Sequence, residues 1–487
     1  MRDKTMTHTG IREIEVHPIS LEHLAQLIGP ERLERFEHAA TDTRGRLGDR
    51  RVVNVNSTAT GGGVAELLQT LLAYARGAGI DARWVVIEGD AGFFEITKRI
   101  HNHLYGTVGD GGPLGPAEHH HYEEATSRNA EALRAFVRAG DVVILHDPQT
   151  AALARIAMPQ GVSVVWRCHV GIDDQNAHSE RGWAFLRPYI EDVDAFVFSR
   201  EQFAPAWIPR DRLATIAPSI DPFSAKNEAM DPDLVRQVLT AVGLVAGRAD
   251  SREMRFTRRT GSTGTISRRI DLLGTAPLPA GSVPIVLQAS RWDGMKDMPG
   301  VMHGFAELIA PHTDAHLVLA GPETNGVTDD PEADRVLRAC LADWQRFPEA
   351  LRRRVHLVCV PMADGAEAAA IVNAVQRHAA VVVQKSLAEG FGLTVSEAMW
   401  KARPVVGSAV GGIVDQIVAG ETGWLVDAHD LEGYARAVCS LLNDAPAADG
   451  MGAAGRDRVV THFLGDRHLE QWAGLFARLQ PGQTGVA

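Results

Sequence analysis

Cysteine is scarce in this chain, with four among 487 residues. Cys168, Cys340, Cys359 and Cys439 lie far apart and form no C-x-x-C pair, which argues against a disulfide scaffold and a structural zinc site. Positive charge is also in deficit, because 49 Lys and Arg face 61 Asp and Glu and leave a net charge of −12. Nucleic acid would need a local basic patch that works against this overall field, so we expect no nucleic-acid partner.

Long apolar runs are missing as well. No stretch reaches the ~18 apolar residues that a membrane-spanning helix needs, and the start, MRDKTMTHTGIREIEVHPIS, has no apolar core of a secretory signal. We therefore expect a cytoplasmic protein that does not bind a membrane. The composition, 45% hydrophobic and 23% charged, is that of a soluble globular chain, and the length suggests two or three domains.

Short β-branched runs alternate with longer helical patterns from about residue 50 onward, a rhythm typical of βα units in parallel sheets. The rhythm breaks between about residues 218 and 283 and then resumes. We therefore predict an α/β fold of two Rossmann-like, doubly wound domains, 1–222 and 223–461, that face a central cleft and bind ligands at the carboxyl ends of their strands. The predicted strands are 51–55, 82–87, 142–145, 163–166, 195–199, 284–289, 315–320, 355–359, 380–384 and 404–407.

A basic insertion at 247–281 lies within this break. From Arg248 to Ile270 seven arginines oppose Asp250 and Glu253, which leaves a local net charge of +5. A mobile, solvated loop is the expected structure. A contact with an anionic partner or with another subunit is the alternative.

The segment NVNSTATGGGVAELL predicts a strand that ends at Val55, a run of three glycines, and a helix that begins near Val64. Such glycines allow backbone N–H groups to approach a phosphate at the positive end of a helix, which makes Gly62 and Gly63 candidate donor-binding residues. The run has neither the GK[ST] ending of a Walker loop nor the G-x-G-x-x-G spacing of a dinucleotide fold. A plain strand-to-helix turn therefore remains the alternative.

The segment QASRWDGMKD places Arg291 and Lys296 on the loop that leaves the first strand of the second domain. A guanidinium and an ammonium that converge from one loop can neutralise a diphosphate without a metal. This favours a nucleotide leaving group and no metal cofactor. A solvated turn, in which Asp293 and Asp297 pair with the two cations, is the alternative.

The segment VVVQKSLAEGFGLTVSEAMW predicts a buried strand, a loop that carries Glu389, and a helix that carries Glu397. The amides of Gly392, Leu393 and Thr394 lie at the start of that helix and can bind a phosphate. The two glutamates are eight residues apart, so they can accept hydrogen bonds from two hydroxyl-bearing rings about a diphosphate apart. A pair of glycosidase acids would instead have to flank a single bond.

This pattern resembles the GT-B glycosyltransferases of the large family of retaining, nucleotide-sugar-dependent enzymes that includes sucrose and trehalose synthases. The E-x7-E element is the donor signature of that family. The resemblance implies that Glu389 binds hydroxyls of the transferred sugar, Glu397 the ribose diol, and Arg291 with Lys296 the diphosphate. Because no carboxylate in these motifs is placed as a nucleophile on the opposite face, we favour front-face substitution.

A narrower resemblance is carried by NVNSTATGGGVAELL, WVVIEGDAGFFEITKRIHN, HDPQ, WRCH and EGFGLTVSEAMW. Together these are similar to the trehalose glycosyltransferring synthases, which condense NDP-glucose with glucose, reversibly, to α,α-trehalose. The resemblance implies a homodimer and a C-terminal helix, 462–480, that packs back on the first domain. The alternatives are a trehalose phosphorylase that uses inorganic phosphate, an α-glycosyltransferase with another acceptor, and a nucleotide-sugar-binding regulatory protein.

Several residues that follow strands of the first domain complete the predicted site. His169 is expected to bind the donor sugar's primary hydroxyl or to cap the oxocarbenium ion, so the predicted catalytic set is His169, Arg291, Lys296 and Glu389. The predicted acceptor-binding residues are Asn56, Glu88, Asp90, His146, Asp147 and Gln149. The triplet 119–121, HHH, is expected in an exposed loop, because adjacent side chains do not readily converge on one metal ion.

Overall fold

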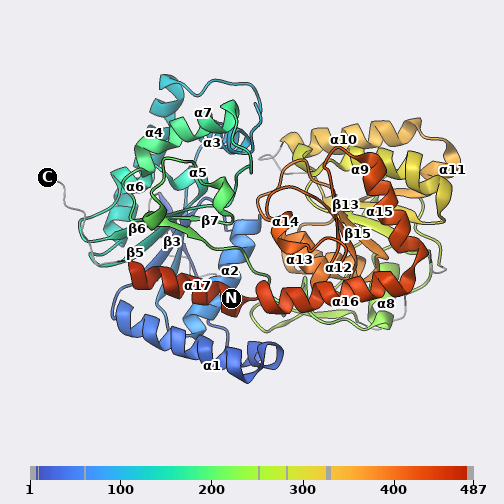
Figure 1. Cartoon of the computed structure of the whole chain (residues 1–487), viewed down its shortest axis with the longest axis horizontal. Coiled ribbons are helices and arrows are strands. Elements are labelled where there is room, and N and C mark those ends of the chain that lie inside the picture. The colour runs from blue at the N-terminus through green and yellow to red at the C-terminus, as the bar shows by residue number, and fades with distance from the viewer. Residues whose placement is uncertain are drawn as a thin grey trace. The chain divides into compact units, whose positions relative to one another are not determined.

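The computed structural model describes residues 7–8, 10–59, 62–249, 253–280, 283–324 and 331–479. The chain forms two compact units (Figure 1). Unit 1 comprises Met1–Ser219 and Phe463–Ala487, and unit 2 comprises Ile220–His462. The chain thus leaves unit 1 three residues before the predicted boundary at 222.

Unit 1 is built on an eight-stranded sheet of order β1-β2-β4-β3-β5-β6-β7-β8. The six strands from β3 to β8 run parallel, and β2 pairs with β4 in the antiparallel sense. The central strands are buried on both faces, as parallel strands between helical layers are. The strands are β1 (Thr7–His8), β2 (Ile11–Ile14), β3 (Val52–Asn56), β4 (Ala82–Ile87), β5 (Val142–His146), β6 (Ser163–Cys168), β7 (Ala195–Phe198) and β8 (Leu213–Thr215).

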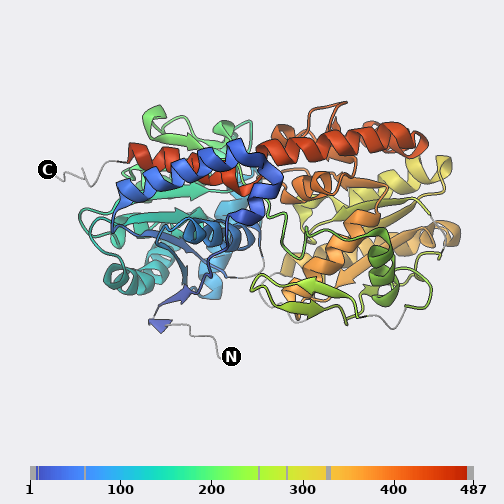
Figure 2. The same ribbon diagram turned by 90° about the horizontal axis from the view of Figure 1, so that it is seen from below.

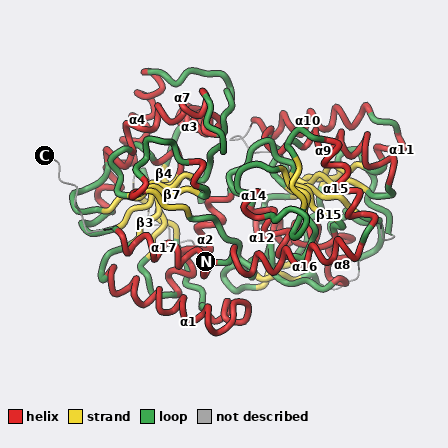
Figure 3. The backbone as a smooth tube through the Cα atoms, viewed as in Figure 1, coloured by secondary structure: helices red, strands yellow, loops and turns green. Residues whose placement is uncertain are grey.

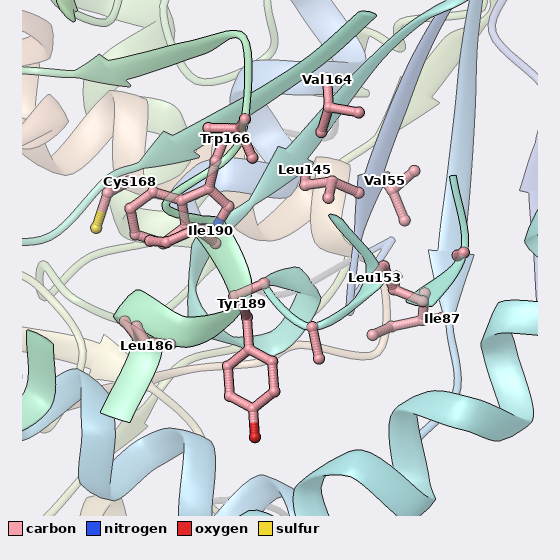
Figure 4. Packing of buried hydrophobic residues seen from close by; sticks show 14 of the residues in the cluster. Val55, Ile87, Leu145, Leu153, Val164, Trp166, Cys168, Leu186, Tyr189 and Ile190 are labelled. Carbon is pink, nitrogen blue, oxygen red and sulfur yellow. The ribbon is translucent and has the colours of Figure 1, made fainter. Parts of the chain in front are cut away.

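Helices cover both faces of this sheet (Figure 3). On one face, Val55, Leu145 and Trp166 pack against Leu186 and Ile190 (Figure 4). The helices of unit 1 are α1 (Glu22–Leu47), α2 (Gly63–Gly77), α3 (Ala91–Leu104), α4 (Pro116–Phe136), α5 (Asp147–Thr150), α6 (Leu153–Ile156), α7 (Ala177–Ile190) and α17 (Gly465–Arg478), with 3-10 turns at Glu201–Phe203 and Arg210–Arg212.

The C-terminal helix α17 lies in unit 1 beside α1 (Figure 2). Arg32 of α1 forms an ion pair with Asp466, with 2.6 Å between Nη2 and Oδ2. His468 hydrogen-bonds Ser219, and the guanidinium of Arg167 stacks over a ring of Trp472 at 5.3 Å. Helix α17 therefore closes the second face of the sheet, where its apolar side chains join the core.

Unit 2 is built on a seven-stranded sheet of order β11-β14-β13-β12-β15-β16-β17, parallel except for β11. The strands of this sheet are β11 (Asp271–Leu272), β12 (Ile285–Ala289), β13 (His316–Pro322), β14 (Val355–Val360), β15 (Val381–Gln384), β16 (Val405–Ser408) and β17 (Trp424–Val426). A separate two-stranded sheet is formed by β9 (Arg255–Thr257) and β10 (Thr263–Thr265). The helices are α8 (Pro232–Ala241), α9 (Met298–Gly304), α10 (Pro331–Arg346), α11 (Glu349–Arg352), α12 (Gly365–His378), α13 (Leu393–Trp400), α14 (Ile413–Gln416), α15 (Leu431–Asn443) and α16 (Ala445–His462). Short 3-10 or π turns occupy Gly294–Lys296, Phe305–Ile309 and Ala310–His312.

The prediction of an irregular loop at 247–281 is wrong for the residues that the structure describes there, although most of them are exposed as expected. β9 and β10 form an antiparallel hairpin, and β11 adds an antiparallel edge to β14. Phe256 and Ile266 are buried. Glu367 of α12 accepts the backbone N–H groups of Ser267 at 2.6 Å and Arg268 at 2.7 Å, which anchors the segment on that helix. Arg258 pairs with Asp364 and Arg268 with Glu367, so part of the segment's arginine charge is neutralised within the unit. Residues 250–252 and 281 lie outside the described residues.

The prediction of an exposed loop at 119–121 is also wrong. These histidines belong to α4, whose first turn is fixed by Pro116 and by a hydrogen bond from the Gly115 amide to Glu118. The ring of His119 stacks on Phe185 at 3.8 Å. Throughout the described ranges, no helix is both long enough and apolar enough to span a bilayer.

Candidate active site

In unit 2, the loops that follow β12 and β15 meet because these two strands are parallel neighbours. Lys296 from the first loop donates to Glu389 from the second, with 2.5 Å between Nζ and Oε2. The two side chains are only 16% and 8% exposed. Ser386 donates a second hydrogen bond to the same carboxylate oxygen at 3.2 Å. The structure thus joins two residues that the sequence assigned to different parts of a donor, the diphosphate and the sugar.

Arg291 lies on the same loop as Lys296 but is half exposed, and its Nη2 is 3.3 Å from Asp293 Oδ2. This is the pairing expected for a solvated turn. Lys296 does not follow that alternative, because it binds Glu389 rather than Asp297. Arg291 therefore remains near solvent while Lys296 is partly buried.

Asp297 pairs with Lys385, a lysine that the sequence analysis did not single out. Asp297 adopts a left-handed backbone, with φ of 45°, and caps α9 by accepting the Gly300 amide at 3.1 Å. Gln288 ties the two loops together, since it donates to Lys296 O at 2.6 Å and accepts from the Lys385 amide at 3.0 Å. The sequence carried a signal for both residues, because Gln288 lies near the end of one apolar strand and Lys385 directly follows another.

The start of α13 lies directly after the Glu389 loop. Gly392 is its N-cap and has φ of 82°, a conformation that favours glycine. The first-turn amides of a helix have no acceptor within the helix, so those of Leu393 and Thr394 are donors that can bind an anion. The hydroxyl of Thr394 is engaged inside the loop, where it donates to Gln384 Oε1 at 2.8 Å.

A glycine pair after β16 holds the Glu389 loop in place. A Cβ on Gly411 would lie 1.7 Å from the carbonyl oxygen of Glu389, and one on Gly412 would lie 2.6 Å from Phe391 Cα. Gln416 completes this contact by donating to the Phe391 carbonyl at 2.5 Å. The glycines of VVGSAVGGI therefore permit a close approach of two backbones, a role that the sequence analysis did not assign.

Glu397 occupies the second turn of α13 and is 1% exposed. Its Oε1 is 3.1 Å from the Nζ of Lys226, whereas its Oε2 has no hydrogen-bond partner among the described residues. A buried carboxylate oxygen without a donor is uncommon, because leaving a polar group unsatisfied costs free energy. This unpartnered oxygen can accept a hydrogen bond from a hydroxyl that reaches it.

In unit 1, the carboxyl ends of β5 and β6 bring His146 and His169 together. His146 Nδ1 is 3.0 Å from His169 Nε2, and the rings stack at 5.3 Å. Asp147 accepts the backbone N–H of His169 at 2.7 Å. Asp147 has φ of 62°, and such strained non-glycine backbones cluster at functional sites.

Burial shifts the protonation of this cluster. It lowers the pKa of both His146 and His169 well below the usual histidine value, and nearby Arg167 lowers them further. It also raises the pKa of Asp147 to about 7, opposed by the His169 amide and by Arg167. Both imidazoles are therefore neutral near pH 7 and present one N–H and one lone pair each.

The other predicted residues of unit 1 fall into two groups. Gly62 and Gly63 lie at the start of α2, and Gln149 is half-buried in α5. Glu88 is exposed just beyond β4, and its backbone pairs with Asn129 through both N–H and C=O. The ligand-binding roles of these four residues stay predictions.

The side chains of Asn56 and Asp90 already have partners within unit 1. Asn56 is buried, accepts from Trp84 Nε1 at 2.7 Å and donates to the Thr58 carbonyl at 2.7 Å, so its amide fixes the loop after β3. Asp90 caps α3 and forms ion pairs with His121 and Arg128, and these contacts lower its pKa. A helix cap and a sugar-binding carboxylate carry the same signature in a sequence, so the sequence alone did not reveal the capping role of Asp90.

Within the described part of the chain, no group of three or more His, Cys, Asp or Glu is arranged to hold a metal ion. The four cysteines are free thiols.

Two family models match the chain. The one described as trehalose synthase, N-terminal domain, covers residues 54–205, and the one described as glycosyl transferases group 1 covers residues 276–458. A trehalose synthase of Thermococcus litoralis is 33% identical over 93% of this chain and 96% of its own length. This chain belongs to the trehalose synthase family. A trehalose synthase of Rubrobacter xylanophilus is similarly related, 34% identical over 89% of this chain and 92% of its own.

The fold of this trehalose synthase family member is GT-B. Sucrose-phosphate synthase from Thermosynechococcus elongatus superposes with a TM-score of 0.60 at 18% identity, over 88% of this chain and 98% of that one. The prediction of two Rossmann-like domains is thereby confirmed. The chain is an enzyme, a hexosyltransferase of trehalose-related glycosyl transfer.

Proposed function

We propose that this enzyme transfers glucose from a nucleoside-diphosphate glucose to free glucose, reversibly and with retention of configuration, and forms α,α-trehalose. The observation that carries the proposal is the partly buried Lys296–Glu389 pair beside the start of α13. It places a cation, a carboxylate and free helix amides on two adjoining loops. That combination suits a ligand with an anionic diphosphate joined to a sugar that is rich in hydroxyls.

The pair implies an exchange of partners when the donor binds. Lys296 leaves Glu389 for the diphosphate, and Glu389 then accepts hydroxyls of the transferred glucose. Arg291 and the amides of Gly392, Leu393 and Thr394 share the diphosphate charge. Glu397 is assigned to the ribose, because its unpartnered Oε2 can accept a hydrogen bond from the ribose diol.

Transfer proceeds by front-face substitution. The bond between the anomeric carbon and the phosphate oxygen breaks, and its electron pair stays on the diphosphate. The acceptor hydroxyl attacks from the same face, and its proton passes to that departing phosphate oxygen. Lys296, Arg291 and the α13 amides stabilise the growing negative charge, and such stabilisation is commonly the main source of rate enhancement in an enzyme. Because these groups supply the positive charge, the reaction needs no metal.

The residues predicted from unit 1 keep the roles that the resemblance implies for them. His169 accepts a hydrogen bond from the donor sugar's primary hydroxyl, and Gly62 and Gly63 approach the donor at the start of α2. Glu88, Asp147 and Gln149 orient the acceptor glucose. His146, predicted in the same group, has both ring nitrogens bound to Asn54 and His169, so in this proposal it acts on the site through His169. Asn56 and Asp90 are left out, because their polar atoms are occupied within the unit.

One experiment tests the substrates and the reaction together. The protein is incubated with glucose plus ADP-, UDP- or GDP-glucose in the presence of EDTA, and the disaccharide is identified by NMR. α,α-Trehalose and free NDP are expected, and trehalose plus NDP should regenerate NDP-glucose. Cleavage of trehalose that depends on inorganic phosphate would identify a phosphorylase instead. A different disaccharide would identify another acceptor.

The homodimer and the cytoplasmic location stay predictions from the sequence. Sedimentation velocity at micromolar concentration tests the former, with a species near twice the 52.6 kDa chain mass expected.

A further inference from the structure

Asn54 is a polar side chain in apolar surroundings. It lies in the middle of β3, is 2% exposed, and lines a cavity of about 50 Å³ formed with α1, α2 and α17. The rest of that lining is apolar except for Thr43 and the indole N–H of Trp472. Burying an amide in such a place destabilises the fold unless the amide is hydrogen-bonded.

The hydrogen bond that Asn54 makes leads to the candidate site. Its Oδ1 lies 3.1 Å from Nε2 of His146, and its Nδ2 has no partner among the described residues. His146 in turn binds His169 through Nδ1, at 3.0 Å from Nε2. Asn54, His146 and His169 therefore form a chain of two hydrogen bonds from the cavity to the end of β6.

The direction of this chain follows from its first member. The Asn54 carbonyl oxygen can only accept, so His146 carries its proton on Nε2. His146 is neutral, so its Nδ1 has a lone pair and accepts from His169. His169 then carries its own proton on Nε2, and its Nδ1 keeps a lone pair. No described residue binds that Nδ1.

We propose that Asn54 is a positioning residue that sets the tautomer of His169 through His146, so that His169 meets the sugar as a hydrogen-bond acceptor. This inference rests on the proposed function for the role of His169, but the tautomer itself does not. The reverse orientation of the Asn54 amide would make His146 Nδ1 the donor and turn His169 Nδ1 into an N–H. His169 would then donate to the sugar instead of accepting from it.

The tautomers are read directly from long-range ¹H–¹⁵N spectra of the full-length protein labelled at histidine, with His146→Gln and His169→Gln used only to assign the signals. At pH 7.5 we expect the proton on Nε2 of both rings. In Asn54→Leu, which keeps the size but removes the acceptor, His169 should become a mixture of tautomers and kcat for trehalose formation should fall about tenfold. The midpoint of thermal unfolding should stay equal or rise, because the unpartnered Nδ2 is removed from an apolar cavity.

Two variants complete the test. Thr43→Val changes another polar residue of the same cavity, whose hydroxyl binds Ala39 O and not His146, and should leave tautomers and kcat unchanged. Asn54→Val also removes the acceptor without adding a charge, so it should show the same mixture of tautomers and provides the comparison if Asn54→Leu does not fold.

The possible results are distinct. A wild-type His169 with its proton on Nδ1 overturns the proposal, as does an unchanged tautomer in Asn54→Leu. A tautomer shift with unchanged kcat supports the positioning by Asn54 and overturns the assigned role of His169. Should the wild type form no trehalose at all while the tautomers are as expected, the proposed function fails and the Asn54 assignment stands.

Discussion

Replacing Glu389 by Gln should strengthen the binding of a free nucleoside diphosphate while turnover collapses. In the resting enzyme Glu389 holds Lys296 at 2.5 Å, so the carboxylate competes with the diphosphate for the same ammonium group. Two unit charges about 4 Å apart interact by roughly 4 kcal/mol at an effective dielectric constant of 20. The pair is not fully buried, and Gln can still accept a hydrogen bond from Lys296. We therefore expect about 1–2 kcal/mol of this interaction energy to appear as tighter binding of the nucleoside diphosphate, roughly 5- to 30-fold.

The matched variant, Lys296→Met, should act in the opposite direction on binding. It removes charge-assisted hydrogen bonds worth about 1.5–3 kcal/mol, which weakens NDP binding roughly 10- to 150-fold. Both variants should lose at least about 100-fold in kcat, since one removes a sugar contact and the other removes charge stabilisation in the transition state. The opposite signs in binding distinguish an exchange of partners from general damage to the loop.

Isothermal titration calorimetry with UDP, ADP and GDP, in the absence of sugar, measures the binding side. Glu432→Gln, a change at an exposed carboxylate of α15, serves as the control and should bind NDP like the wild type. Circular dichroism and thermal unfolding confirm the fold of each variant. The reasoning is refuted if Glu389→Gln weakens NDP binding as much as Lys296→Met does.

Three further outcomes are expected. Gly411→Ala should lower kcat by about 100-fold in a steady-state assay. The new Cβ would lie 1.7 Å from the carbonyl oxygen of Glu389, so the Glu389 loop must move. Near-normal turnover would contradict this tight contact. Asp147 has a pKa of about 7 in the fold against 3.8 unfolded, so the folded state holds a proton that the unfolded state releases, and stability falls as pH rises from about 4 to 7. Between pH 5 and pH 8 the wild type should therefore lose on the order of 2 kcal/mol more unfolding free energy than Asp147→Asn, as measured by urea unfolding. The same pH dependence in both proteins would rule out the raised pKa of Asp147. Glu367→Gln should reduce the unfolding free energy by about 1–3 kcal/mol, because the charge-assisted hydrogen bonds from the Ser267 segment are weakened. Its kcat should be retained, because residue 367 contacts neither of the loops that carry Lys296 and Glu389. A large loss of kcat would contradict this expectation.

The strands that carry the candidate site could be predicted from the sequence because their β-branched runs are buried on both faces. The predicted strand at 82–87 coincides with β4, and the predicted end of the strand at 384 coincides with the end of β15. The residues that follow these ends were therefore placed at the correct edge of each sheet. α1 was missed, since Gly29 and Pro30 interrupt its periodicity and its two parts join across a kink.

The pairing of side chains could not be predicted in the same way. Lys296 and Glu389 are 93 residues apart and meet only because β15 lies beside β12, a neighbour relation set by sheet order. The hairpin of β9 and β10 was not predicted, because its strands are only three residues long and lack an apolar run. Asn54 carried no signal at all, since its importance lies in the burial that surrounds it and in its contact with His146.

The central claim is that the loops after β12 and β15, with the start of α13, hold the diphosphate of a sugar nucleotide. A crystal structure of the enzyme soaked with a nucleoside diphosphate tests this most directly. The account predicts phosphate oxygens within hydrogen-bond distance of Lys296 Nζ and of the Leu393 and Thr394 amides, with Lys296 detached from Glu389. A diphosphate bound elsewhere, or a Lys296–Glu389 pair that persists beside it, would contradict the account.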